Sequence, residues 1–342
     1  MTVVGYDPKL RPAQPPTPAA DAFTIHRAEV ADGLSLAYVR EGVGGYPLLL
    51  IHGYPETKRI WWRNIEPLVA AGFEVIVPDL RGHGDSDFSA DDTYDLVAYS
   101  RDLHALVHDV LGHEHIGIAA GDVGGVVGVD MAQRFDGFVD GLCFFDTVPP
   151  MLIDAYAEAG IDLGSIRAIG DHPTGDYRRR QGADPDGLAA EMPTPEARRA
   201  FIATMYGPRL WASPGTFSDA DVAFHTEPWA DEARLRAGWA VYQLGHGRPM
   251  SEAPVLDRPV DVPTLLFYGA DDQVVGPDFL HCCEVAFTDR VGPLVLAGAG
   301  HFLQWERADV FNPTVAMFFI ALAARLGRSV PAPAPAPQGG AR

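Results

Sequence analysis

One carboxylate stands where the chain turns sharply from a predicted strand into a predicted helix. The segment GDVGG at residues 121–125 follows a buried-strand pattern at 115–120 and precedes a helical pattern. Small neighbours let the backbone turn hard enough to lift one side chain, here Asp122, from the edge of a sheet. An aspartate with an ordinary pKa near ~3.9 is ionised at neutral pH and can attack a saturated carbon directly, forming an ester. Asp122 is therefore a candidate nucleophile, with the alternative that its side chain only caps the following helix.

Two loops farther along the chain offer the groups that such a nucleophile needs. Asp271 and Asp272 follow a strand pattern at 264–268, and His301 follows a strand pattern at 294–296. A carboxylate can orient a histidine, and the histidine can activate water against an ester. The order nucleophile, acid, histidine is that of a hydrolase triad. The pentapeptide G-x-S-x-G, which would carry a serine nucleophile, does not occur in the sequence. The turn at Asp122 therefore excludes a serine esterase.

Composition narrows the class of partner. The chain has 342 residues, of which 47% are hydrophobic, and a formal net charge of −20. Binding to nucleic acid needs clustered Lys and Arg, so we expect no nucleic-acid partner and instead a neutral, apolar small-molecule substrate. The three cysteines have neither a disulfide framework nor metal-ligand spacing. No signal-peptide pattern and no stretch of the ~20 apolar residues of a membrane span is found. We therefore expect a cytoplasmic protein with no membrane partner.

Strand and helix patterns alternate through most of the chain. Buried apolar runs such as 47–51 and 73–77 are separated by helical patterns such as 57–71, which indicates a parallel sheet with helices on both faces. From 151 to 258 the pattern is helices and loops, including a helix that begins with Thr194 as its N-cap. An insertion at this place predicts a helical cap over the carboxyl ends of the strands. The expected organisation is a flexible segment 1–22, a core in two parts (23–150 and 259–328), the cap 151–258 between them, and a disordered Pro- and Ala-rich tail 329–342.

Five motifs give the chain a resemblance to a known superfamily. They read LLLIHGYPE, DLRGHGDSD, GDVGG, FYGADDQVV and GAGHFLQWER, and they span residues 47–306. With these motifs the chain resembles the aspartate-nucleophile branch of the α/β-hydrolase superfamily, and most closely the epoxide hydrolases, which are related to haloalkane and haloacetate dehalogenases. The resemblance implies the α/β-hydrolase fold, a mostly parallel sheet with helices on both faces and an inserted helical cap. It implies neither a cofactor nor a metal.

The resemblance also implies a role for each group of the site. Asp122 would be the nucleophile, His301 the base and Asp272 the acid that orients the histidine. In some relatives the acid follows the preceding core strand instead, and Asp146 occupies that place here, so it is the alternative acid. The backbone N–H groups of Tyr54 and Val123 would form the oxyanion hole.

Two tyrosines of the cap protonate the epoxide oxygen in the family. Tyr242 resembles the second of the pair, although it also shares a helical stripe with Leu235 and Trp239 that would serve equally for packing. Tyr177 is the nearest match for the first, but the spacing around it departs from the family pattern, and His172 is a possible substitute.

Departures from the family patterns bear on the reaction. The residue before the nucleophile is Gly121, where a histidine is usual. Val123 stands where haloalkane dehalogenases place a halide-binding Trp, and no cation follows the nucleophile before Arg134, where haloacetate dehalogenases use arginines. The sequence therefore predicts an epoxide hydrolase that forms a vicinal diol. The alternatives are a haloacetate or haloalkane dehalogenase with the same ester mechanism, and a hydrolase-fold protein that only binds a ligand.

Overall fold

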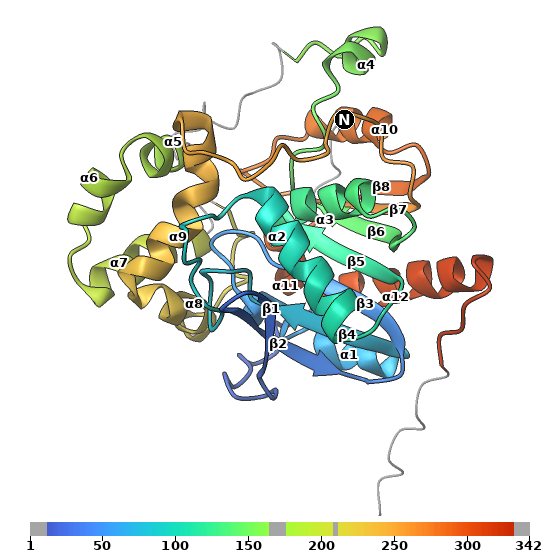
Figure 1. Ribbon diagram of the computed structural model, residues 1–342, viewed down its shortest axis with the longest axis horizontal. Coiled ribbons are helices and arrows are strands. Elements are labelled where there is room, and N and C mark those ends of the chain that lie inside the picture. Colours follow the sequence, from blue (N-terminus) through green and yellow to red (C-terminus); the bar gives the residue numbers. More distant parts are fainter. Residues whose placement is uncertain (1–11, 164–175, 208–210, 332–342) are drawn as a thin grey trace, which may run out of the picture.

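A computed structural model describes residues 12–163, 176–207 and 211–331, with only the backbone of residues 176 and 177. Its centre is one eight-stranded sheet in the order β1-β2-β4-β3-β5-β6-β7-β8 (Figure 1). Strand β2 is antiparallel to both of its neighbours, and the strands from β4 to β8 are parallel to one another. The strands are His26–Ala31 (β1), Leu34–Glu41 (β2), Tyr46–Ile51 (β3), Phe73–Pro78 (β4), Ile116–Gly121 (β5), Val139–Phe145 (β6), Thr264–Gly269 (β7) and Arg290–Leu296 (β8). The predicted mostly parallel sheet is therefore confirmed.

Helices cover both faces of this sheet. Within β5, a side chain at Gly117 would meet the ring of Phe319 in α12, whereas Ile118 lies against Gly128 of α3. Because successive residues of a strand point to opposite faces, α12 and α3 lie on opposite sides of the sheet. The helices flanking the sheet are Ile65–Ala70 (α1), Leu96–His104 (α2), Asp122–Arg134 (α3), Phe279–Ala286 (α10), Leu303–Glu306 (α11) and Ala308–Arg325 (α12).

The helix expected over 57–71 is wrong as a continuous element. The structure has a 3-10 turn at Lys58–Trp61 (η2) and a separate short helix α1 that starts at Ile65. Pro67 explains the break, because it has no N–H to donate to the carbonyl of Arg63. That carbonyl accepts instead from Asn312 Nδ2 at 3.0 Å.

Between β6 and β7 the described chain is helical. Its elements are Ile153–Glu158 (α4), Asp176–Ala183 (α5), Pro185–Ala190 (α6), Pro195–Ala203 (α7), Thr204–Tyr206 (η5), Asp219–Thr226 (α8), Glu227–Ala230 (η6), Glu232–Gln243 (α9) and Leu244–His246 (η7). The predicted N-cap is confirmed, since the Thr194 side chain accepts from the N–H of Ala197. Helices α5 to α9 lie together beside one end of the sheet (Figure 1), and we call residues 176–246 the interstrand helices.

Helix α12 is long and apolar enough to cross a membrane by length and composition alone. Phe311, Val315 and Phe319 of this helix are fully buried in the core, and α12 packs on α1 and β6. Its apolar composition is therefore accounted for by its place against the sheet.

Candidate active site

The turn between β5 and α3 holds Asp122 in a strained conformation. Asp122 has a φ of +47°, a region that residues other than glycine rarely adopt and that is often found at functional sites. The turn is also crowded, because a Cβ on Gly53 would lie 2.5 Å from Asp122 Cβ, and one on Gly124 would lie 2.7 Å from the carbonyl oxygen of Ile51. Glycine at these two positions lets the chain pass this closely. The sequence context thus produces the sharp turn that was predicted.

The Asp122 side chain does not cap the helix. The N-cap of α3 is Gly121, with no side-chain cap bond, so that alternative is wrong. Asp122 Oδ1 instead accepts from the backbone N–H of Tyr54 at 2.8 Å. The carboxylate is thus directed away from its own helix and toward the loop after β3.

His301 joins the two carboxylates that the sequence singled out. Its Nε2 lies 3.3 Å from Asp122 Oδ2, and its Nδ1 lies 3.0 Å from Asp272 Oδ2. The side chains of His301 and Asp272 are 1% and 0% exposed, whereas that of Asp122 is 17% exposed. The chain of contacts therefore ends in one carboxylate that is partly exposed to solvent. Both ring nitrogens face a carboxylate, so the histidine offers no free nitrogen to a metal ion.

The charges around His301 favour its protonated form. Burial by itself lowers the pKa of His301, but the Asp272 carboxylate and then the hydrogen bond to Asp122 outweigh burial and raise the pKa well above its usual range. If the charge on Asp122 is removed by esterification, one of these stabilising contacts disappears. The histidine then gives up its proton more readily and becomes available as a base.

Asp272, and not Asp146, contacts the histidine. Asp272 Oδ1 accepts from the backbone N–H groups of Val274 and Val275 at 2.6 and 3.2 Å, which leaves Oδ2 directed at His301. Asp146 accepts from the N–H of Gly269 through Oδ1 at 2.8 Å. The geometry therefore favours Asp272 as the orienting acid.

Asp146 is a second buried carboxyl group close to this site. It has a φ of +44°, and its Oδ2 is buried with no hydrogen-bond partner among the described residues. Burial, and next the charge of Asp272, raise the pKa of Asp146 well above its usual range. This environment disfavours the charged form of the carboxyl group, which suits it poorly to orienting a histidine by charge.

The two predicted oxyanion donors both adjoin Asp122. The N–H of Tyr54 already donates to the Asp122 carboxylate. Val123 is the second residue of α3, where a backbone N–H has no intrahelical acceptor. Tyr54 and Val123 also line one small recess together with His83 and Val241.

The predicted proton donors are placed in part. Tyr242 lies in α9, and its ring packs edge-on against that of Tyr54 with 5.5 Å between centroids. Tyr242 therefore contacts the residue whose N–H donates to Asp122. Tyr177 lies in the first turn of α5, a helix that packs on α9. The Tyr177 side chain and His172 lie outside the described residues.

Comparisons with known proteins agree with this fold. Residues 46–163 match the family described as the alpha/beta hydrolase fold. A soluble epoxide hydrolase from Corynebacterium sp. (strain C12) is 29% identical over 88% of this chain and 98% of its own length. The chain therefore has the α/β-hydrolase fold.

The proteins to which this chain is similar include two kinds of enzyme. A haloalkane dehalogenase from Bradyrhizobium diazoefficiens is 27% identical, with 85% of this chain and 93% of the relative covered. Among solved structures, an epoxide hydrolase without ligand superposes with a TM-score of 0.71 at 25% identity, covering 88% of this chain and 99% of its own. The hydrolase described here therefore has relatives in both classes that the sequence motifs suggested.

The interstrand helices of the hydrolase hold the loop that contacts Asp122. Gln181 Nε2 and Trp239 Nε1 donate to the Tyr54 hydroxyl at 2.8 and 3.0 Å. The Tyr206 hydroxyl and Trp229 Nε1 donate to the carbonyl oxygen of Pro55 at 2.7 and 3.1 Å. The sequence does not predict these positioning roles of Gln181, Tyr206 and Trp229. Polar residue types in buried helices were the only available signal, and they do not specify a partner.

We expect Tyr54→Phe to lower the free energy of unfolding by about 1–3 kcal/mol, since it leaves two buried N–H donors without an acceptor. Urea unfolding of the purified protein measures the change. Tyr99→Phe is the matched control, because the Tyr99 ring is equally buried but its hydroxyl has no hydrogen-bond partner among the described residues. Equal destabilisation of the two variants would contradict a specific role for the Tyr54 hydroxyl.

Proposed function

We propose that this α/β-hydrolase is an epoxide hydrolase that works through an alkyl ester on Asp122. The observation that carries the proposal is the continuous chain from Asp272 through His301 to the partly exposed Asp122 carboxylate. A carboxylate nucleophile gives an ester whose own carbonyl carbon can then be attacked by water. The interstrand helices act as the cap in this proposal, because they contact Tyr54, whose N–H donates to Asp122.

In the first half-reaction, an Asp122 oxygen attacks a ring carbon of the epoxide and the carbon–oxygen bond of the ring breaks. The ring oxygen becomes an alkoxide unless it receives a proton, which makes a donor necessary. Tyr242 is the proposed proton donor, because its ring borders Tyr54. Tyr177 in α5 is the proposed second donor. The product of this step is a hydroxyalkyl ester of Asp122.

In the second half-reaction, His301 takes a proton from a water molecule, and the resulting hydroxide attacks the carbonyl carbon of the ester. The negative charge that develops on the Asp122 carbonyl oxygen is met by the N–H groups of Tyr54 and Val123. Preorganised donors of this kind contribute about 3–4 kcal/mol each in comparable sites. The acyl–oxygen bond then breaks, and the proton of the newly added hydroxyl passes to the departing alkoxide, which releases the diol and restores the Asp122 carboxylate. Return of the proton on His301 to the tyrosine that protonated the ring oxygen completes the cycle.

A second candidate is a dehalogenase, supported by the haloalkane dehalogenase relative. The nucleophile, base and acid would be the same, but carbon–halogen cleavage needs hydrogen-bond donors for the leaving halide in place of a proton donor. Val123 supplies no side-chain donor next to the nucleophile, and α3 has no cationic side chain before Arg134. This departure favours the epoxide hydrolase.

The two candidates are separated by trapping the ester. We expect a His301→Gln variant to accumulate a covalent adduct with styrene oxide, because glutamine fits the site but cannot act as a base. Intact mass spectrometry should show an added mass equal to the whole epoxide, since ring opening loses no atoms. The adduct should disappear when Asp122→Asn is added.

Parallel incubations with fluoroacetate and 1-chlorobutane complete the test. An adduct from either halide, with halide released and none from the epoxide, would establish the dehalogenase instead. If none of the three reagents forms an adduct, the protein would be better described as a ligand-binding member of the fold.

We expect Tyr242→Phe to slow ester formation from styrene oxide about 100-fold, because one proton donor to the ring oxygen is removed. The rate is measured in a protein that also carries His301→Gln. Its reaction with styrene oxide is quenched at short times, and the fraction of protein that carries the adduct is determined by intact mass spectrometry. In the Tyr242→Phe variant that retains His301, hydrolysis of the ester should keep its rate, since Tyr242 takes no part in that step. Slowing of hydrolysis alone would contradict the assignment.

A further inference from the structure

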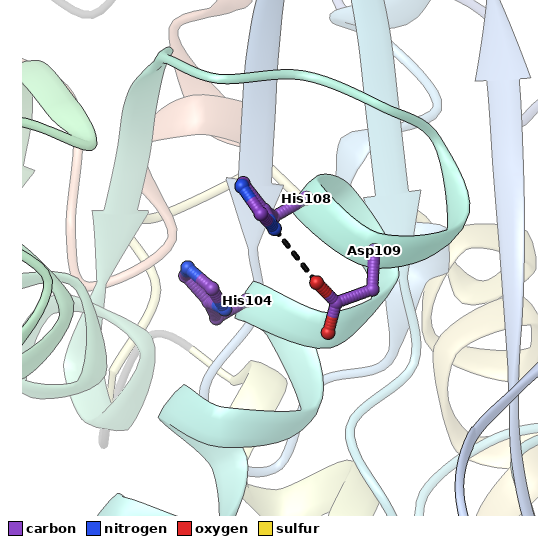
Figure 2. A group of neighbouring side chains, drawn as sticks. All are labelled: His104, His108 and Asp109. Atoms are coloured by element: carbon purple, nitrogen blue, oxygen red, sulfur yellow. Dashed lines mark hydrogen bonds and ion pairs between the residues drawn. The ribbon is translucent and has the colours of Figure 1, made fainter.

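Three potential metal ligands gather at the end of α2. His104 is the last residue of α2, and His108 and Asp109 lie in the following turn η3 (Ala105–Val110), with their side chains on one side of the chain (Figure 2). One donor atom from each of the three residues lies within 4.8 Å of the others. His108 Nδ1 is 2.7 Å from Asp109 Oδ1. We propose that His104, His108 and Asp109 bind a divalent transition-metal ion such as Zn²⁺.

The unusual backbone of η3 is what brings the three residues together. Residues 105–110 form a π-helix, whose hydrogen bonds run over five residues, as from Leu111 N–H to the Leu106 carbonyl oxygen at 3.0 Å. In a regular α-helix, Asp109 would lie about 140° around the axis from His104. The wider π turn reduces that angle, so that residues four and five positions after His104 both come beside it. Such turns are rare and are found frequently at functional sites.

The His104 ring is held in place by aromatic packing. It stacks on Phe135 with centroids 3.9 Å apart and on His108 with centroids 4.9 Å apart, and it also contacts Phe138 at 4.7 Å. The ring of this proposed ligand is therefore fixed by its aromatic neighbours.

Two imidazole nitrogens and one carboxylate oxygen are a ligand set that suits Zn²⁺ and its first-row neighbours. At metal–ligand distances of about 2.0–2.2 Å the donor atoms would stand about 3–3.5 Å apart. The side chains of His108 and Asp109 are 46% and 63% exposed, so they can rotate to close the remaining gap around the fixed His104 ring. The remaining coordination positions face solvent and would be filled by water.

This site is separate from the candidate active site. Turn η3 leads into the amino end of β5, whereas Asp122 follows its carboxyl end, and a six-residue strand spans about 20 Å. The metal would therefore tie the end of α2 to the π turn and would not take part in the reaction of Asp122.

Isothermal titration calorimetry of the purified full chain with Zn²⁺ alone measures the affinity and the number of sites and so tests the proposal. We expect one site per chain, with affinity about tenfold weaker or worse in His108→Gln and in Asp109→Asn, since even the loss of an outer partner weakens metal sites 10–100-fold. Both substitutions are at exposed positions, so folding should be preserved. His281→Gln is the matched control, because His281 is an exposed histidine beside Glu284 on α10 and the described residues place no third ligand next to this pair.

A thermal scan gives a second reading that is independent of activity. Zn²⁺ should raise the melting temperature of the wild-type protein and of His281→Gln, and it should raise that of the two ligand variants less, as binding to the native state requires. Equal Zn²⁺ affinity in the wild type and in both ligand variants would overturn the site. Loss of binding through His281→Gln would overturn it as well.

Discussion

Replacing Asp122 by asparagine is expected to lower kcat/KM for styrene oxide by about 10⁴-fold or more. The amide retains an oxygen that can accept the N–H of Tyr54, so the turn should keep its shape while the nucleophile is lost. Removal of a catalytic nucleophile typically costs several orders of magnitude in rate. Steady-state assays of diol formation measure the loss.

Asp92→Asn provides the control for this experiment. Asp92 also has a positive φ, of 60°, but it lies on the surface and pairs with Arg248. Its substitution should leave kcat/KM unchanged within experimental error. An Asp122→Asn protein that keeps more than about a tenth of wild-type activity would contradict the ester mechanism.

The second large effect is expected from replacing Asp272, the proposed orienting acid. Asp272→Asn should lower kcat about 10³- to 10⁴-fold, because the amide cannot stabilise the positive charge that His301 acquires when it takes a proton from water. Asp146→Asn should lower it less than about tenfold. Asparagine keeps an oxygen for the N–H of Gly269 and replaces a carboxyl group whose charged form burial disfavours by raising its pKa.

The pair of variants decides between the two acids because both keep the size of the side chain. Single-turnover measurements should show that Asp272→Asn slows ester hydrolysis more than ester formation, since His301 acts as a base only in the later step. The opposite ranking of the two variants would assign the orienting role to Asp146.

Several features of this hydrolase could be predicted from local sequence. The strand of small and β-branched residues before Gly121, the sharp turn at Asp122 and the order in which the acid and histidine follow are all local patterns, and the structure contains each of them. Propensity and periodicity predict such elements because their causes lie within a few residues along the chain. The helix predicted over 57–71 is broken in the structure, because Pro67 cannot donate to the nearby carbonyl of Arg63, which accepts from the distant Asn312 instead.

The partners of the site residues depended on the tertiary structure. Asp272 and Asp146 both follow core strands, and only the packing of the β7 and β8 loops directs one of them to His301. The same holds for Gln181 and Trp239, which meet the hydroxyl of Tyr54 across more than a hundred residues of chain. A sequence thus determines which groups are available and in what order, because these are local properties. Which groups come within hydrogen-bonding distance is decided by the register and packing of segments far apart in the chain.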